Sequence, residues 1–476
     1  MNYYDVIIIG GGMGGLVCGT ILSQAGKSVL VLEQGAQAGG CIQSYRRGGL
    51  MYDTGFHYVG ALGVGQLLYP LFDYLGLMSL PWHQLDAEGF DHVMIGGRNF
   101  IFASGYDAFV KTLADEFPHE RMALQKYADM LSTRNTDAIQ QMQTSAYQYL
   151  TTLFHDSLLV NVLSGRSIGV ELRRNTLPLF TFAHCQAPFI ESSWRLRGDG
   201  SMIVRRLMGA ITKNGGKILC SADVEKLDVR DGKVVAAQCR NGETFEGRTF
   251  ISSLHPALTC DLVKTGLKDT FRHRIVTQKN TQGMFTVSLH MKPQRVPYFN
   301  YNQYIYRKPN VWTYTEDVGS VGGVMVSCRV PQKGTWTEQI DLLTPVRWTM
   351  WEEWKDSSAR RRSMFYEHLK RRFADECIQL AERFIPGLSD KYDRRYISTP
   401  LTWCDYVATP DGSAYGIRKD YHQPLMTILS PRTSIPNLLL TGQSLVVHGL
   451  QGVTQTAFNT CSEILGKDYI QQILKI

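Results

Sequence analysis

Two side chains that can take part in proton transfer, His57 and Tyr58, lie next to each other early in the chain. They follow a turn-like triplet at 53–55, and residues 56–59 alternate between apolar and polar types as in a strand. An imidazole titrates near neutral pH and a phenol donates hydrogen bonds, so both groups suit general acid–base chemistry. A buried histidine or tyrosine also commonly serves only to satisfy a backbone group. The preceding fifty residues indicate which role applies.

Those residues have the order of a parallel β-α-β unit. A β-branched apolar run at 5–9 predicts a buried strand, and it leads into a G-x-G-x-x-G spacing at 10–15. A helical pattern follows at 16–25 and is closed by Gly26. A second buried strand is expected at 28–32. Together these elements predict a dinucleotide-binding unit, whereas a glycine turn alone would not.

Each motif residue has a physical task in such a unit. Gly10 allows the tight turn, Gly12 lets the backbone approach a pyrophosphate, and Gly15 lets the helix pack on the strand. The helix N-terminus binds the phosphates, and Glu33 accepts hydrogen bonds from a ribose. The dinucleotide-binding residues expected in this region are Gly10, Gly12, Met13, Gly14, Gly15, Glu33 and Gln34.

The segment after Glu33 departs from an NAD domain, because a second glycine pair, Gly39-Gly40, follows in place of further β-α units. The stretches LEQGAQAGGCIQSY and YDTGFHYVG resemble the flavoprotein superfamily of amine oxidases, phytoene desaturases and carotenoid isomerases. The resemblance is greatest to the all-trans-retinol 13,14-reductase (retinol saturase) branch. Residues 437–465 (NLLLTGQSLVVHGLQGVTQTAFNTCSEIL) resemble the C-terminal cofactor motif of that branch. In that branch two cysteines and a histidine-bearing stretch follow the glycine pair, whereas this chain reads Cys41-Ile42-Gln43-Ser44. This difference leaves the identity of the substrate open.

This resemblance implies an α/β fold in which a discontinuous Rossmann-like FAD-binding domain accompanies a second, α+β substrate domain. It places the second glycine pair along the FAD pyrophosphate and Val224 beside the adenine, where the alternative is an ordinary strand valine. It also places the segment after Gly55 near the flavin ring, so that His57, Tyr58 and His448 become the candidate catalytic residues. Further FAD-binding residues implied are Gly39, Gly40, Cys41, Gly55, Val224, Gly442, Gln443, Gly452 and Val453.

The expected domains are discontinuous. The FAD-binding domain comprises 1–68, 195–283 and 431–476, with a helical substrate or lid region at 69–194 and the substrate-domain sheet and helices at 284–430. Strands are expected at MFTVSLHM, NQYIYR, VWTYTE and GGVMVSCRV, between residues 284 and 330. No second dinucleotide fingerprint is present, so the electron donor or acceptor is not identified.

Composition excludes several classes of protein. The ten cysteines are scattered without a C-x-x-C pair, which favours reduced thiols in a cytoplasmic protein and argues against a metal site. A formal charge of +7 without a recognition motif argues against nucleic-acid binding. The chain opens on the buried strand, so we expect no signal peptide, and no apolar run is long enough for a spanning helix.

One basic segment leaves two interpretations open. Residues 360–362 and 370–372 are rich in Arg and Lys and fall on a helix expected from 352 to 384. The segment is either a solvated helix face or, together with interrupted apolar helices at 150–163, a surface for peripheral binding to an anionic membrane.

Three functions remain open at this stage. The first is an FAD-dependent oxidoreductase that saturates, desaturates or isomerises C=C bonds of a long apolar polyene or isoprenoid by hydride transfer. The second is a flavin oxidase of the amine-oxidase or protoporphyrinogen-oxidase kind. The third is a non-catalytic lipid-binding module on the same fold, as in the Rab GDP-dissociation inhibitors, which tend to lose the FAD-binding residues that are present here.

Overall fold

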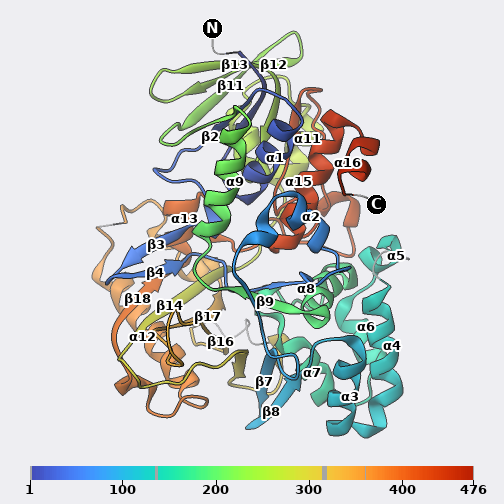
Figure 1. Ribbon diagram of the computed structural model, residues 1–476, viewed down its shortest axis with the longest axis vertical. Helices are drawn as coiled ribbons and strands as arrows, with labels where there is room; N and C mark the ends of the chain where they lie inside the picture. Colours follow the sequence, from blue (N-terminus) through green and yellow to red (C-terminus); the bar gives the residue numbers. More distant parts are fainter. Residues whose placement is uncertain (1–2, 134–137, 314–318, 360, 475–476) are drawn as a thin grey trace.

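A computed structural model describes residues 3–133, 138–313, 319–359 and 361–474 of the chain. Two large sheets dominate these residues, one in the upper and one in the lower half of the molecule as drawn in Figure 1. The N-terminal strand and the C-terminal helices both belong to the upper half. The mixed α/β fold class expected from the sequence is confirmed.

The first sheet is built around β1 (Tyr3–Ile9), which lies between β2 (Val29–Leu32) and β13 (Thr244–Ser252). β10 (Lys217–Leu219) pairs with β2, and β19 (Leu438–Leu440) pairs with β13, all in parallel. Strands from the two ends and the middle of the chain therefore share one parallel sheet. Two antiparallel strands complete it beyond β13, namely β12 (Lys233–Cys239) and β11 (Val224–Arg230).

Helices cover both faces of this sheet because its central strand is apolar on both sides. Val6 and Ile8 belong to one buried cluster, and Ile7 and Ile9 belong to another on the opposite face. On the first face lie α1 (Met13–Gln24), α9 (Ser201–Lys213) and α15 (Gly449–Leu465), and on the second lie α10 (Pro256–Leu262) and α11 (Asp269–Val276). The carboxyl end of β1 and the start of α1 therefore lie in the middle of this sheet, between the helices that cover its two faces.

The second sheet is mixed and has the order β18-β14-β17-β16-β15-β7-β8. Only β15 and β7 pair in parallel, and this pairing sets Asn302 beside Asp91. The strands are β7 (Asp91–Ile95), β8 (Arg98–Phe102), β14 (Gly283–Met291), β15 (Asn302–Tyr306), β16 (Gly323–Cys328), β17 (Gln339–Val346) and β18 (Tyr392–Ser398).

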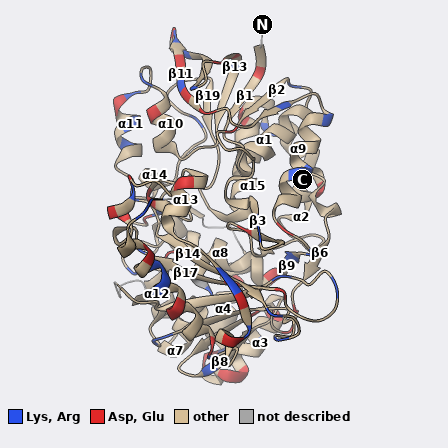
Figure 2. Cartoon of the chain, turned by 90° about the vertical axis from the view of Figure 1, so that its left-hand side faces the viewer, with Lys and Arg blue, Asp and Glu red and all other residues tan. Residues whose placement is uncertain are grey.

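The two faces of the second sheet have different partners. Phe285, Val287 and Ile305 pack under α12 (Met364–Ala381), which lies along β14 and β17 in Figure 2. Met284 and Tyr304, one position away along the same strands, face the opposite way into a separate cluster formed with helices. This alternation leaves one face of the sheet available to a cavity.

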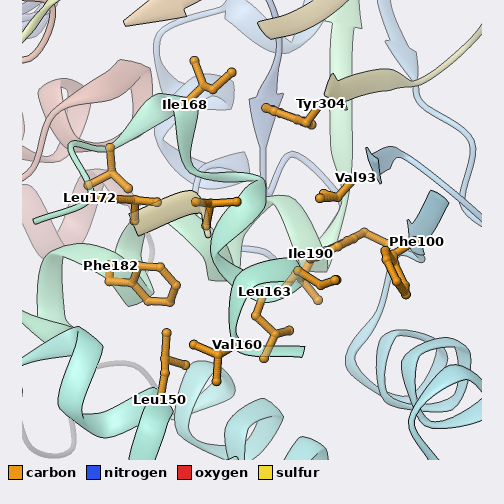
Figure 3. Packing of buried hydrophobic residues seen from close by; sticks show 14 of the residues in the cluster. Val93, Phe100, Leu150, Val160, Leu163, Ile168, Leu172, Phe182, Ile190 and Tyr304 are labelled. Carbon is orange, nitrogen blue, oxygen red and sulfur yellow. The ribbon is translucent and has the colours of Figure 1, made fainter. Parts of the chain in front are cut away.

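A group of helices forms the wall opposite that face, and its apolar side chains meet in the cluster of Figure 3. Leu150, Val160 and Leu163 are at most 4% exposed there. Most apolar side chains at 150–163 therefore belong to the core, and the partly exposed Leu153 and Leu158 pack against it. The helices are α3 (Tyr106–Glu116), α4 (Arg121–Ser132), α5 (Ala138–Gln143), α6 (Ala146–Leu153), α7 (Ser157–Gly165) and α8 (Leu179–Glu191).

Short elements connect these layers. They are the strands β3 (Ser44–Arg47), β4 (Leu50–Asp53), β5 (Val59–Gly60), β6 (Trp82–Gln84) and β9 (Ser193–Leu196), and the helices α2 (Tyr69–Tyr74), α13 (Pro400–Val407), α14 (Pro424–Thr427) and α16 (Lys467–Leu474). Within the described ranges, none of the helices is both long and apolar enough to cross a bilayer.

The predicted helix at 352–384 is wrong over about its first third. Among the described residues from 352 to 363, one short 3-10 turn, Glu352–Trp354, forms before α12, which starts at Met364. Ser363 caps α12 by accepting a hydrogen bond from the Tyr366 N–H at 3.4 Å, and this fixes the start of the helix.

The predicted strand at 311–316 is also wrong where it is described. Val311–Thr313 is a 3-10 turn, and the rest of the predicted strand lies outside the described residues. The side-chain oxygens of Asn161 and Asn310 bind the N–H groups of Val311 and Trp312, at 2.8 and 3.1 Å, in place of a strand partner.

The strand-like pattern at 56–59 forms a strand only at its end. Residues 56–58 are irregular, and β5 begins at Val59.

The basic residues of α12 are largely ion-paired. Lys370 lies 3.5 Å from Glu367, Arg372 lies 3.9 Å from Glu376, and Arg395 of β18 binds Asp375. Both basic (blue) and acidic (red) residues lie on this helix in Figure 2. These pairs support the interpretation of α12 as a solvated helix face.

Candidate active site

The glycine loop after β1 forms one end of a cavity. Gly10 has φ +98°, a backbone conformation that favours glycine. A Cβ atom on Gly15 would lie 2.1 Å from the Gly10 carbonyl oxygen, so α1 approaches the loop closely only because residue 15 is glycine. Gly12 precedes α1 without a side-chain cap, and Met13 and Gly14 open the helix at the cavity wall. The Gly15 N–H donates to Ser253 Oγ at 3.0 Å, and the N–H groups before it at the helix start suit a pyrophosphate.

Glu33 holds this loop from the end of β2. Its Oε2 accepts a hydrogen bond from the Gly11 N–H at 2.7 Å, and its Oε1 accepts one from the Gly35 N–H at 2.7 Å. Each carboxylate oxygen retains a further lone pair that a ribose hydroxyl can use. Glu33 therefore has a structural role in addition to the predicted ligand role.

The second glycine pair packs directly against the first loop. Gly39 has φ +133° and Gly40 has φ +53°, and a Cβ on Gly40 would lie 3.1 Å from the Cα of Gly12. The Gly39 N–H donates to the Gly11 carbonyl at 2.8 Å. Burial raises the pKa of the adjacent Cys41 to about 12, so this residue is a neutral thiol at pH 7. A neutral thiol at this position is consistent with packing beside the cofactor.

A third wall comes from the C-terminal segment. Gly442 has φ +109°, and a Cβ on Gly452 would lie 2.3 Å from the Val447 carbonyl oxygen as α15 begins. Of the predicted cofactor-binding residues, those that line the cavity are Gly10, Gly12, Met13, Gly14, Glu33, Gln34, Gly40, Cys41, Gly55, Val224, Gly442, Gln443, Gly452 and Val453. Gly15 and Gly39 do not line it and act through the packing described above.

The same cavity, with a volume of about 380 Å³, continues from the glycine loops to the second sheet. Its far end is formed by apolar and aromatic side chains, chiefly Met284, Tyr304, Met325, Leu343, Phe189 and Trp403. The predicted catalytic residues His57, Tyr58 and His448 also line it. A dinucleotide-binding surface and an apolar surface are therefore continuous, with those three residues in one wall.

His57 lies between this cavity and a smaller one of about 20 Å³ that is also lined by Asp53, Arg195 and Arg329. The His57 Nε2 atom is buried and has no partner among the described residues. Burial lowers the pKa of His57 to about 4, although the carboxylate of Asp53 acts in the opposite direction. The side chain is thus neutral at pH 7. The expectation that it titrates near neutral pH is wrong, because burial cannot be inferred from its position in the sequence.

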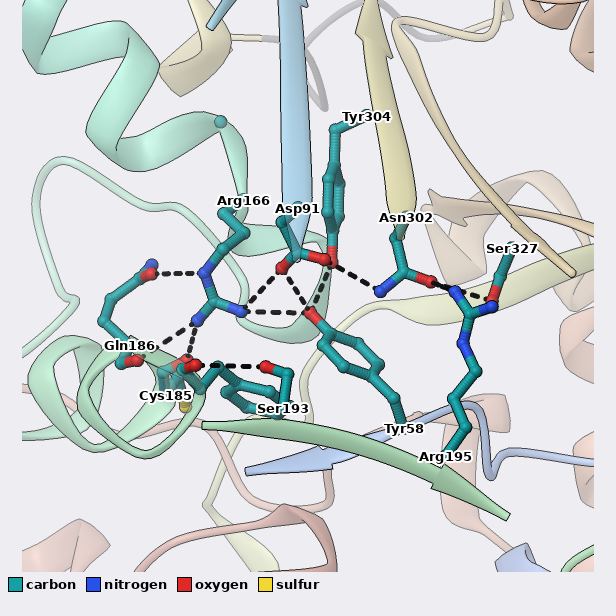
Figure 4. Close-up of polar contacts among 12 residues, drawn as sticks. Tyr58, Asp91, Arg166, Cys185, Gln186, Ser193, Arg195, Asn302, Tyr304 and Ser327 are labelled. Atoms are coloured by element: carbon teal, nitrogen blue, oxygen red, sulfur yellow. Dashed lines mark hydrogen bonds and ion pairs between the residues drawn. The ribbon is translucent and has the colours of Figure 1, made fainter. Parts of the chain in front are cut away.

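Tyr58 belongs to a buried polar cluster at the apolar end (Figure 4). Its hydroxyl donates to Asp91 Oδ2 at 2.9 Å, accepts from Arg166 Nη1 at 3.0 Å, and lies 2.7 Å from the Tyr304 hydroxyl. Asn302 Nδ2 donates to the other oxygen of Asp91 at 2.8 Å. We refer to Tyr58, Asp91, Arg166, Asn302 and Tyr304 as the polar cluster.

The ion pair inside the polar cluster is fully buried. Arg166 Nη1 lies 3.2 Å from Asp91 Oδ2, and the two side chains are 2% and 0% exposed. Burial alone would lower the pKa of Arg166, but the oxygens of Tyr58 and Asp91 raise it above its usual value, so the guanidinium stays charged. Nε donates to Gln186 Oε1, and Nη2 donates to the Cys185 and Gln186 carbonyls.

His448 is held in place as part of the wall. Its Nε2 lies 2.7 Å from the Gly169 carbonyl oxygen, and its ring stacks on Tyr415 at a centroid distance of 4.3 Å. Burial lowers the pKa of His448 to about 4, so it donates this bond as a neutral imidazole at pH 7. A direct catalytic role for His448 stays a prediction.

Sequence patterns did not indicate Asp91, Arg166, Asn302 or Tyr304 as site residues. No motif marks them, and Arg166 and Tyr304 lie 108 and 246 positions from Tyr58 along the chain. A pairing of distant segments, β7 with β15 in particular, brings them together.

Known proteins resemble the chain over most of its length. The NAD(P)-binding Rossmann-like domain family matches residues 8–75. The all-trans-retinol 13,14-reductase of Homo sapiens is 26% identical over 536 residues, covering 98% of this chain and 86% of the reductase. Prolycopene isomerase 2, chloroplastic, from an Oncidium hybrid cultivar is 23% identical over 496 residues, covering 96% and 82%. The chain is therefore similar to these reductases and isomerases over nearly its whole length.

A solved structure shares the fold of this chain. A double mutant of putrescine oxidase aligns with a TM-score of 0.68 and 14% identity, covering 98% of this chain and 99% of the oxidase. The resemblance and the fold class predicted from the sequence are confirmed, and a flavin-type dinucleotide cofactor is supported.

Proposed function

We propose that the chain is an FAD-dependent oxidoreductase that saturates, desaturates or isomerises C=C bonds of a long apolar polyene or isoprenoid. The observation that carries this proposal is the single cavity in which the glycine loops and an apolar end adjoin. The similarity to retinol reductases and prolycopene isomerases over nearly the whole chain supports it. FAD, when bound, supplies the group that gives or takes a hydride.

The residues of the cavity have two kinds of role, namely binding of the cofactor and substrate, and proton transfer. Two glycine pairs and the start of α1 bind the pyrophosphate, and Glu33 binds a ribose. Apolar side chains at the far end exclude water from the polyene. His57, neutral at pH 7 with an unpartnered Nε2, is the candidate for proton transfer there.

Charge at the apolar end favours a polyene over an amine. Among the described residues that line the cavity, the acidic ones are Glu33 and Asp223, both near the glycine loops. Asp91 lies behind Tyr58 and is already neutralised by Arg166. An ammonium substrate would find no unpaired carboxylate at the apolar end, and desolvating it would be costly.

The test is a half-reaction on purified protein. FAD is expected in the visible absorbance spectrum. After anaerobic reduction of the flavin, all-trans-retinol should reoxidise it, and mass spectrometry should find a product that has gained two hydrogen atoms. A product of unchanged mass but altered double-bond geometry would identify isomerisation as the reaction among those proposed. Bleaching of oxidised flavin by putrescine or cyclohexylamine would favour an amine oxidase. Protein that stays colourless after incubation with FAD would favour a lipid-binding module.

Peripheral membrane association is proposed on a surface different from the one first expected. Tyr406 lines the cavity and is 65% exposed, which places it at the opening. Arg362 binds Asp405, the residue before Tyr406, at 2.8 Å, so the start of α12 lies beside this opening. Met364 and Phe365 at the start of α12 are 82% and 77% exposed. An apolar substrate dissolved in a bilayer would reach the cavity through this surface. The electrons would come from a separate donor that docks on the protein.

A further inference from the structure

The small cavity of about 20 Å³ beside His57 is lined by three side chains that each have an unpartnered buried nitrogen. The atoms are His57 Nε2, Arg195 Nε and Arg329 Nε, none of which has a hydrogen-bonding partner among the described residues. Both guanidinium groups lie close enough to His57 to act on its pKa. Because an unbonded polar group in the interior is costly, three such atoms around one cavity indicate a polar ligand.

The other nitrogens of the two arginines are already bonded. Arg195 Nη2 donates to Asn302 Oδ1 at 2.6 Å (Figure 4). Arg329 Nη2 lies 2.6 Å from Asp53 Oδ2. The Nη1 atom of each arginine donates to a backbone carbonyl, at 2.7 and 3.0 Å respectively. These bonds hold both guanidinium groups in place, so each Nε–H is a fixed donor.

A water molecule suits this set of groups better than an anion does. The water oxygen accepts two hydrogen bonds, as Arg195 and Arg329 require, and its protons can go to His57 Nε2 and to a carboxylate. Asp53 and Asp341 also line the cavity, are 5% and 4% exposed, and would repel an anion. The volume is sufficient as well, since a buried water needs roughly 10–15 Å³.

We propose that the small cavity binds one water molecule, which accepts from Arg195 Nε and Arg329 Nε, donates to His57 Nε2, and thereby fixes the ring proton of His57 on Nδ1. A neutral imidazole carries one proton, so a ring nitrogen that accepts a hydrogen bond leaves the proton on the other nitrogen. Arg195 and Arg329 are then positioning residues that act on His57 through the water.

This water also gives His57 a proton route that avoids the apolar end of the main cavity, a step that rests on the proposed function. His57 lines both cavities. Saturation adds a hydride from the reduced flavin to one carbon of the C=C bond and a proton to the other. His57 gives this proton from Nδ1 while Nε2 takes one from the water, so the ring is neutral before and after. The hydroxide left between the two guanidinium groups regains a proton from solvent past Arg329, whose side chain is 18% exposed. Desaturation runs the same steps in reverse.

The first test needs neither substrate nor turnover. A high-resolution crystal structure of the purified protein should show one water oxygen within about 3.2 Å of the three nitrogens. NMR of protein with ¹³C-labelled histidine rings should show the Nδ1–H form of His57 at pH 7, with its signal identified by its loss in His57→Gln. A bromide ion at this position in bromide-soaked crystals, a cavity without density, or the Nε2–H form would overturn the inference and leave the proposed function intact.

A conservative variant tests the proton route. Arg329→Lys keeps the charge beside Asp53 but removes the Nε donor. The rate at which saturating all-trans-retinol reoxidises the reduced flavin should fall about tenfold, as expected for one lost buried hydrogen bond, with flavin content and half-saturating concentration unchanged. Arg418→Lys is the matched control and should keep the wild-type rate, because Arg418 is 19% exposed and binds Glu171 at 2.8 Å without lining either cavity.

A double variant separates positioning from a general structural effect. In a His57→Gln background, Arg329→Lys should cause no further loss of rate, because Arg329 acts through His57. An equal loss in both backgrounds would overturn the proton route and mark Arg329 as a structural residue. Wild-type protein that does not react with all-trans-retinol or with any other polyene would overturn the proposed function and the route together, whereas the bound water would still be decided by the density and the NMR spectrum.

Discussion

Arg166 and Asp91 form an ion pair in which Nη1 lies 3.2 Å from Oδ2 and neither side chain is more than 2% exposed. Removing one partner would leave an uncompensated charge in the interior. Asp91→Asn should therefore lower the free energy of unfolding by about 3–5 kcal/mol. Chemical denaturation followed by circular dichroism measures this change.

An exposed pair provides the control for that experiment. Arg98 and Glu116 lie 2.9 Å apart with side chains 55% and 48% exposed, so Glu116→Gln should cost less than about 1 kcal/mol. The double variant Arg166→Met with Asp91→Leu should recover much of the loss, because no charge is then left unpaired. Equal losses for Asp91→Asn and Glu116→Gln would contradict the buried ion pair.

Glu33 provides a test of cofactor binding. Glu33→Ala removes a ribose ligand and also releases the Gly11 and Gly35 N–H groups, which were each bonded at 2.7 Å. We expect FAD affinity to fall by at least about tenfold, measured as the flavin-to-protein absorbance ratio after dialysis. Gln24→Ala, at an exposed residue at the end of α1 that does not line the cavity, is the control. Unchanged flavin content in Glu33→Ala would contradict the assignment.

The part of the site that the sequence could predict is local. Strand, glycines, helix and second strand follow one another within the first fifty residues, and each imposes its conformation on its neighbours, as with φ +98° at Gly10. The C-terminal strand at 438–440 and the helix after it could be predicted for the same reason.

The part that could not be predicted depends on contacts between distant segments. Tyr58 contacts residues 33, 108 and 246 positions away, and no periodicity in the sequence reports such pairs. The protonation state of His57 depends on its burial, and the start of α12 depends on the cap at Ser363. The proposed domain boundaries and catalytic roles stay predictions.

For His57, an effect of substitution on turnover must be distinguished from an effect on folding or FAD binding. If its Nε2 accepts the transferred proton, His57→Gln should bind FAD normally, stay folded and lose about two to four orders of magnitude in turnover. Flavin absorbance and steady-state turnover are measured on the same preparation. Loss of flavin along with turnover would mark His57 as a packing residue of the cofactor site. Full turnover would remove it from the mechanism.

The lowered pKa of His57 also predicts a pH dependence of stability. Its pKa is about 4 in the folded chain against an ordinary value of 6.5, so between these pH values the unfolded chain binds more protons than the folded one. The free energy of unfolding should therefore fall as pH is lowered from 6.5 to 4, by on the order of 3 kcal/mol for this group. His57→Gln should show a shallower fall in denaturation experiments across this range, whereas His119→Gln, at an exposed position, should match the wild type. Parallel curves for wild type and His57→Gln would exclude a buried neutral imidazole.

The exposed apolar residues beside the cavity opening predict how the protein meets a membrane. Met364 and Phe365 are 82% and 77% exposed, whereas the apolar side chains at 150–163 belong mainly to the core. Most of the basic residues of α12 are ion-paired. Binding to anionic vesicles should therefore depend mainly on these two side chains, with a smaller contribution from the formal charge of +7 that salt screens. The variant Met364→Ser with Phe365→Ser should float with vesicles much less than the wild type. Met122→Ser, at a residue 77% exposed on α4, is the matched control and should float normally. Equal flotation with neutral and anionic vesicles would remove the electrostatic contribution, and wild-type protein that floats with neither would remove the membrane proposal.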